Sequence, residues 1–185
     1  MAEASSPASA ASRAVSEPEF SLTRGFDAPR DLVFRTWTRA DHLIHWWGPA
    51  GCEVIHADID LRPGGVFLYG MRARDGETIW GRWLFRVVSA PDSLEFLSAT
   101  CDERGRPHRH ATTPDWPLET LATLRLIDDG ERTTLALTGV PFNASPRECE
   151  VFAAAVDSMS HGWKGALDQF EAYVAHAADG VGSST

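Results

Sequence analysis

Residues 146–176 read PRECEVFAAAVDSMSHGWKGALDQFEAYVAH, and this segment decides the fold. Its apolar residues recur at spacings of four and three, the period of one face of an α-helix. The apolar stripe consists of Phe152, Val156, Met159, Trp163, Leu167, Phe170 and Val174. Pro146 near the start, preceded by Ser145 as a cap, is typical of a helix N-terminus. We therefore predict one long amphipathic helix that must bury its stripe against another layer.

Two glycines, Gly162 and Gly165, flank Trp163 within this helix. Each is expected to destabilise the helix by about 1 kcal/mol relative to alanine. We interpret them as positions that let the helix approach the neighbouring layer closely. The ring of Trp163 is then expected to point inward, toward Phe85 or Tyr69.

The layer that faces the helix is predicted to be a β-sheet. From residue 52 to 140, short runs of alternating apolar and polar residues are separated by turn residues such as Asp75-Gly76 and Asp129-Gly130. Strands are predicted at 54–61, 66–72, 78–89, 94–100, 118–127 and 133–140, with a long polar loop at 102–117. Consecutive strands joined by short turns form an antiparallel meander.

The parity of each strand predicts which side chains face the helix. On the long strand, Gly81, Trp83, Phe85 and Val87 share one face, whereas Arg82 and Arg86 share the other. On the neighbouring strands the predicted inward residues are Phe67, Tyr69, Met71, Leu94, Phe96, Leu124, Leu126, Leu135 and Leu137.

The start of the folded part adds one strand and two short helices. Residues 20–26 alternate as a strand does, and Asp27 is expected to cap the following helix near Pro29. Apolar residues from Leu32 to Trp47 indicate two short helices, which end at the turn 48–51. Residues 1–18 and 177–185 show no hydrophobic period and are predicted to be disordered, which leaves one domain at 19–176.

A long helix with an apolar stripe and a sheet of about six or seven strands with one apolar face can bury these surfaces against each other. The sequence therefore predicts an α+β domain in which a curved antiparallel sheet wraps around the C-terminal helix.

Four segments also carry a resemblance to a known family. They are FSLTRGFDAPRDLVFRTWT (20–38), HLIHWWGP (42–49), DIDLRPGGVFLYGM (58–71) and GWKGALDQFEAYV (162–174). In this order they resemble the bacterial proteins related to the C-terminal domain of the activator of heat-shock-protein-90 ATPase. These proteins belong to the START-like (SRPBCC, helix-grip) superfamily. The resemblance covers 19–176 and implies a helix-grip fold with a cavity between sheet and helix.

Relatives in this superfamily bind lipids, polyketides or plant hormones in that cavity, and some are cyclases. The similarity to the co-chaperone concerns one of its domains, so it does not imply co-chaperone activity. The pattern of residues alone does not measure a void, and the expectation of a hollow interior comes mainly from the resemblance.

The residues predicted to bind a ligand are the aromatic and soft side chains of the inward faces. Of the adjacent rings Trp46 and Trp47, one is expected to plug the space between the short helices and the sheet, and the other to line the cavity. The full predicted set is Trp46, Trp47, Phe67, Tyr69, Trp83, Phe85, Phe96, Met159 and Trp163, with Tyr69 as the polar group. Each of these, taken singly, fits an ordinary aromatic core better than a ligand contact.

The composition disfavours several classes of partner. The chain of 185 residues has a formal net charge of −9 and no basic run, which disfavours nucleic acids and anionic membranes. We find neither a secretory signal nor an apolar run that could span a bilayer. Three widely spaced cysteines, Cys52, Cys101 and Cys149, fit a reducing compartment. We therefore expect a cytoplasmic protein.

Motifs that would indicate chemistry are weak in this sequence. We find no phosphate-binding loop, dinucleotide fingerprint or nucleophile elbow, and we predict no cofactor, no metal and no catalytic residue. The pair of histidines in His108-Arg109-His110 resembles a metal-binding pattern, but a solvated loop over the cavity mouth explains it better.

Three functions remain as hypotheses. The first is the binding of a small hydrophobic or aromatic molecule in the cavity. The second is an enzyme, a cyclase, dehydratase or hydrolase, in which Tyr69 or His161 acts as acid or base on an apolar substrate. The third is an interaction protein that docks on a chaperone or pairs with a second copy as a homodimer.

Overall fold

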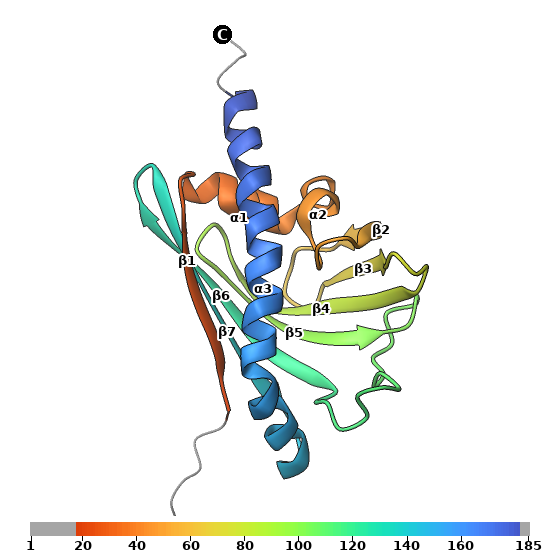
Figure 1. The fold of residues 1–185 in the computed structure, drawn as a ribbon. Helices are drawn as coiled ribbons and strands as arrows, with labels where there is room; N and C mark the ends of the chain where they lie inside the picture. The colour runs from red at the N-terminus through yellow and green to blue at the C-terminus, as the bar shows by residue number, and fades with distance from the viewer. Residues whose placement is uncertain (1–17, 182–185) are drawn as a thin grey trace, which may run out of the picture.

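The computed structural model describes residues 18–181 and confirms the predicted α+β architecture (Figure 1). Seven strands form one antiparallel sheet in the order β1-β7-β6-β5-β4-β3-β2. The meander from β2 to β7 therefore follows the sequence, and the first strand pairs with the last. The long helix α3 crosses one face of this sheet, and the short helices α1 and α2 lie beside its C-terminal half (Figure 1).

The elements are β1 (Phe20–Phe26), α1 (Arg30–Thr38), α2 (Ala40–Trp46), β2 (Glu53–Ile59), β3 (Val66–Arg72), β4 (Thr78–Ser89), β5 (Ser93–Cys101), β6 (Glu119–Asp129), β7 (Arg132–Phe142) and α3 (Pro146–Val181). Helix α3 runs to Val181, past the residue at which the domain was expected to end. Of the two tails expected to be disordered, residues 1–17 and 182–185 lie outside the described residues.

The N-termini of α3 and α1 differ in how they are capped. At α3 the Ser145 hydroxyl accepts a hydrogen bond from the Glu148 N–H (3.3 Å), and the Glu148 carboxylate accepts one from the Ser145 N–H (2.7 Å). This reciprocal cap confirms the prediction for Ser145. The predicted cap of α1 by Asp27 is wrong. Pro29 is the N-cap residue there and no side chain caps it, while Asp27 instead pairs with Arg132 (3.1 Å).

The hydrophobic core lies between α3 and the inward face of the sheet. The predicted strand parity is confirmed by the full burial of inward residues such as Phe67, Leu94 and Leu124. Val87 is the exception, because a register shift after Phe85 forms a bulge in β4. The bulge turns Val87 outward, where it is 45% exposed, and the next residue, Val88, packs against the core instead.

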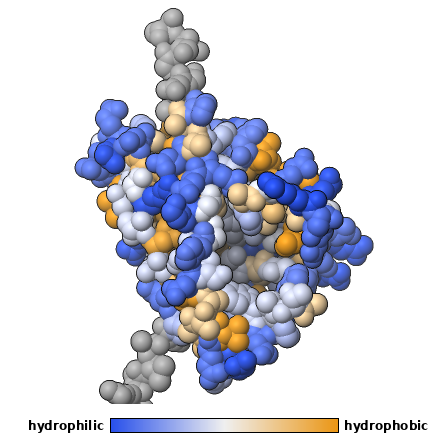
Figure 2. All heavy atoms as spheres, in the orientation of Figure 1, coloured by the Kyte–Doolittle hydropathy of each residue, from blue (hydrophilic) through white to orange (hydrophobic). Residues whose placement is uncertain are grey.

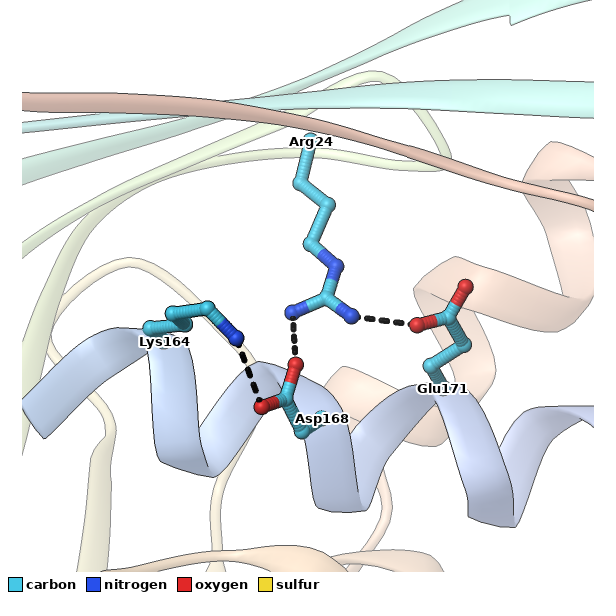
Figure 3. Close-up of polar contacts among 4 residues, drawn as sticks. All are labelled: Arg24, Lys164, Asp168 and Glu171. Carbon is cyan, nitrogen blue, oxygen red and sulfur yellow. Dashed lines mark hydrogen bonds and ion pairs between the residues drawn. The ribbon is translucent and has the colours of Figure 1, made fainter. Parts of the chain in front are cut away.

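A cluster of charged residues joins α3 to the edge strand β1 (Figure 3). Arg24, on the helix-facing side of β1, pairs with Asp168 (2.6 Å) and with Glu171. Lys164 also contacts Asp168 (3.0 Å), one helical turn away. Ion pairs at this degree of exposure each contribute about 1 kcal/mol or less. Burial of apolar surface therefore contributes more than these ion pairs to the attachment of α3 to the sheet.

Candidate ligand-binding site

The inward face of the sheet changes from large to small side chains along strands β4 to β7. Near one end of these strands the inward residues are phenylalanine, leucine and tryptophan, and they fill the core. Near the other end they are small: Gly81, Ser98, Thr100, Thr120, Ala122 and Gly139. The strand registers bring these residues together, because Gly81 pairs with Thr100, Ser98 with Thr120 and Ala122 with Gly139. A space is therefore left between this part of the sheet and α3.

That space is a cavity of about 240 Å³. Figure 2 shows its opening as a hollow in the surface beside α3, over strands β4 and β5 of Figure 1. The sheet and the end of α2 contribute the rings of Trp47, Tyr69 and Trp83, and α3 contributes Met159 and Trp163. The volume lies near the lower limit of small-molecule sites, which typically measure about 300–1,000 Å³.

The loop between β5 and β6 lies over the mouth of the cavity, as predicted. Its cavity-lining residues are His108, Arg109, His110, Thr113, Trp116, Pro117 and Leu118. Three contacts hold the loop against α3: Arg109 pairs with Glu148, Asp115 pairs with Arg147 (3.2 Å), and Trp116 packs on Phe152 with ring centroids 5.4 Å apart. The hydrogen bond from Arg109, followed by those from Ser145, lowers the pKa of Glu148 to about 2. The pair is therefore fully ionised at neutral pH.

Tyr69 is placed in the cavity wall by the glycine opposite it. Tyr69 is 9% exposed and pairs across the strands with Gly81. A Cβ atom on Gly81 would lie 2.3 Å from both Cζ and Oη of Tyr69, so the phenol occupies the place of the missing side chain. Burial, with a smaller effect of Cys101, raises the pKa of Tyr69 well above its ordinary value. The phenol is therefore protonated at neutral pH.

The indole of Trp47 lies next to this phenol, with ring centroids 5.5 Å apart and planes at 80°. Its N–H is close enough to oppose part of the rise in the pKa of Tyr69. The two groups nevertheless do not reach hydrogen-bond geometry, and within residues 18–181 the buried Trp47 Nε1 has no hydrogen-bond partner. The cavity wall thus carries two neighbouring donors, one N–H and one O–H.

The structure places six of the nine predicted ligand-binding residues at the cavity wall: Trp47, Tyr69, Trp83, Phe96, Met159 and Trp163. The other three, Trp46, Phe67 and Phe85, are buried in the core beside the cavity and do not line it. Trp46 packs between Trp37 of α1 and Phe170 of α3, with ring centroids 4.9 and 4.7 Å away, and its Nε1 donates to the carbonyl of Thr36 (3.0 Å).

Trp163 points in a direction that the sequence did not predict. It stacks on Trp37, with centroids 6.2 Å apart and planes at 14°, and on Phe20 at 6.5 Å and 22°. The expected contacts with Phe85 or Tyr69 are therefore replaced by contacts with α1 and β1.

An apolar groove on the surface lies beside the cavity. Trp47, Met159 and Trp163 line both hollows and so form the partition between them. Gly162 also lines the groove, and among the described residues outside the helix's own backbone no atom lies within 4 Å of a Cβ added there. The same holds for Gly165. The interpretation that these glycines permit close approach to the sheet is therefore wrong.

The other candidate residues lie away from the cavity or lack partners for chemistry. His161 is exposed, as a histidine on the helix surface would be, its Nδ1 lies 2.7 Å from the carbonyl of Asp157, and it lines neither hollow. His108 and His110 line the mouth, but within residues 18–181 no group of three metal-ligating side chains converges. None of the described helices is both long and apolar enough to cross a membrane.

Sequence reasoning predicted the loop over the mouth, but it missed the small residues that create the cavity and did not single out Thr113 and Trp116 of the loop as lining residues. The signal was present, because the inward positions of four consecutive strands step from large to small at the same level of the sheet. The loop residues gave no comparable signal, since their approach to the cavity depends on long-range contacts with α3.

An antiparallel sheet of seven strands around a long C-terminal helix, with two short helices after the first strand, defines the helix-grip class of START-like domains. Within that class, residues 27–175 match the family model described as Activator of Hsp90 ATPase homolog 1-like protein, and the chain belongs to this family. The resemblance found in the sequence is therefore confirmed. No curated protein matches the chain.

Solved structures from several bacteria share the fold. A protein from Arthrobacter aurescens is 28% identical, with a TM-score of 0.70 over 86% of this chain and 87% of that chain. A protein from Mycobacterium smegmatis is 26% identical, with a TM-score of 0.68 over 84% and 90% of the two chains. The AHSA1 protein from Silicibacter pomeroyi, at 19% identity, shows the same fold with a TM-score of 0.66 over 86% and 99%.

Proposed function

We propose that this domain binds a small hydrophobic or aromatic molecule in the cavity between the sheet and α3. The observation that carries the proposal is the hollow itself. Small residues at neighbouring inward positions leave about 240 Å³ open, on a face that large apolar side chains fill elsewhere. Membership of a START-like family agrees with this function.

The walls favour a flat apolar ligand. Trp47, Trp83 and Trp163 present indole rings to the cavity, and such rings pack well against aromatic faces and edges. Burial of apolar surface would supply the binding free energy, at about 25 cal/mol for each Å² removed from water. The enzyme hypothesis has less support. The protonated phenol of Tyr69 can donate a hydrogen bond but cannot act as a base, and His161 lies outside the cavity.

Native mass spectrometry of the purified protein tests the proposal directly, through the mass of a small molecule that co-purifies with it. A titration of the ligand-free protein with tetralin and naphthalene provides the second test. Tryptophan fluorescence should change, because five tryptophans line the cavity, and the melting temperature should rise with ligand concentration.

A matched pair of variants separates the cavity from the rest of the protein. Ala122→Leu adds three carbons to an inward position at the cavity wall and should abolish tetralin binding without loss of stability. Ala136→Leu makes the same change on the opposite face of β7, where the side chain lies away from the cavity, and should leave binding intact. If tetralin bound equally to both variants, or to neither the wild type nor any variant, the cavity would not be the site.

A further inference from the structure

The cavity wall contains a donor that the protein leaves unpaired. Among the described residues, four buried side-chain nitrogens lack a hydrogen-bond partner, those of Arg30, Trp37, Trp47 and Arg82. Of these residues, Trp47 alone lines the cavity. A buried N–H without a partner is unfavourable, because the group has lost its hydrogen bonds to water. The nitrogen has almost no accessible surface in the empty cavity, so a bound molecule would reach it through a small shift of the indole, and by accepting this hydrogen bond it would remove the penalty.

A second donor lies beside the first. The hydroxyl of Tyr69 is held over Gly81, next to the indole of Trp47. The hydroxyl of Tyr173 has a hydrogen-bond partner at 2.8 Å in Nδ1 of His42, whereas the hydroxyl of Tyr69 has no such partner among the described residues. The indole N–H can only donate, and the phenol at neutral pH is an O–H that can donate to the same atom. Neighbouring donors of this kind suit one oxygen with two lone pairs.

The charge around the cavity indicates that this oxygen is neutral. The cation at the cavity mouth, Arg109, is already paired with Glu148, and the net charge of the chain is −9. A carboxylate among these aromatic walls would be buried without an unpaired cation, which is strongly unfavourable. A carbonyl oxygen accepts two hydrogen bonds without this penalty.

We propose that the molecule bound in the cavity carries a neutral carbonyl oxygen that accepts hydrogen bonds from Trp47 Nε1–H and the Tyr69 hydroxyl. This inference rests on the proposed function, since it specifies the chemistry of a ligand at the same site. The ligand class is therefore an apolar ketone, aldehyde, ester or amide of about two fused rings in size, rather than a pure hydrocarbon or an acid.

The test compares 1-tetralone with 1-methylidenetetralin, in which a CH₂ group replaces the oxygen. Because the two probes share one shape, the ratio of their Kd values cancels any change in packing that a variant introduces. We expect 1-tetralone to bind the wild type about tenfold more tightly. The preference should fall to about threefold in Tyr69→Phe and in Trp47→Phe, and vanish in the double variant. Tyr173→Phe, which removes the hydroxyl outside the cavity, should leave it unchanged.

The outcomes distinguish this inference from the proposed function. Equal affinity of the wild type for both probes would overturn the inference and leave the proposed function standing, because apolar binding would persist without the oxygen. A tenfold preference that survives in the double variant would also overturn it, since another group would then be the donor. Failure of both probes to bind the wild type would overturn the two proposals together.

Discussion

Replacement of Gly162 or Gly165 by alanine is expected to stabilise the protein. Both positions lie well inside α3, which runs from Pro146 to Val181, so the cost of glycine is not reduced by fraying at a helix end. A methyl group at either position would meet no described neighbour within 4 Å. Each substitution should therefore gain the full difference in helix propensity, about 1 kcal/mol.

Thermal and urea unfolding measure this gain. For a domain of this size, 1 kcal/mol corresponds to a rise of about 2–4 °C in melting temperature, and the double variant should gain roughly twice that. The urea midpoint should rise while the slope of the unfolding free energy with urea stays constant. Gly81→Ala is the control of opposite sign, because its methyl group would lie 2.3 Å from the Tyr69 phenol and must displace it.

The result that would refute this reasoning is a fall in melting temperature for Gly162→Ala or Gly165→Ala. Such a fall would show that the helix approaches its neighbours as closely as the sequence pattern suggested, and that α3 lies nearer to other parts of the protein than in the structure. A rise for Gly81→Ala would similarly contradict the placement of Tyr69 over the glycine.

Three further predictions concern other groups of the site. Because the pKa of Glu148 is lowered from 4.5 to about 2, the stability from its pairing is present above about pH 4.5 and lost as the pH falls toward 2. The urea midpoint should therefore fall more steeply with acid in the wild type than in Glu148→Gln, and exposed Glu150→Gln serves as the control. Burial raises the pKa of the Cys101 thiol to about 11 and leaves it 2% exposed, so alkylation followed by mass spectrometry should label the other two cysteines first; equal rates would contradict its burial. Trp163→Ala should lower the unfolding free energy by about 2 kcal/mol, less than the 3–5 kcal/mol of a fully packed tryptophan, because this ring borders two hollows; a loss above 4 kcal/mol would place it in the packed core.

The fold could be predicted from the sequence because its two layers have different periods. A spacing of four and three from Phe152 to Val174 specifies a helix, and alternation with turn residues specifies the strands. The predicted strand parity was wrong where tertiary structure changed the local pattern of the strand. The bulge after Phe85 shifts the parity of β4 and turns Val87 outward, and the adjacent apolar residues Val87 and Val88 do not show by themselves which of the two faces the core.

The candidate site was predicted less completely, for a physical reason. An aromatic residue at an inward position has the same pattern whether it fills the core, as Phe85 does, or borders a void, as Trp83 does. The difference lies in what stands on the neighbouring strand. Trp83 is paired with Ser98, whereas Phe85 is paired with Phe96. Only the register between strands distinguishes the two environments, and register is a property of pairs that single-strand patterns do not contain.

The energetic cost of the cavity bears on its function. An unfilled cavity destabilises a protein by about 24 cal/mol for each Å³, so a volume of about 240 Å³ corresponds to at most about 6 kcal/mol. Water at the open mouth reduces this value, but it remains comparable with a total stability of roughly 5–15 kcal/mol. The chain does place large residues on the same face, at Leu124 only two positions from Ala122. The hollow therefore reflects particular small residues rather than a lack of apolar ones. Ala122→Leu should then gain stability as it loses binding, which is the trade-off expected where a void is kept for a ligand.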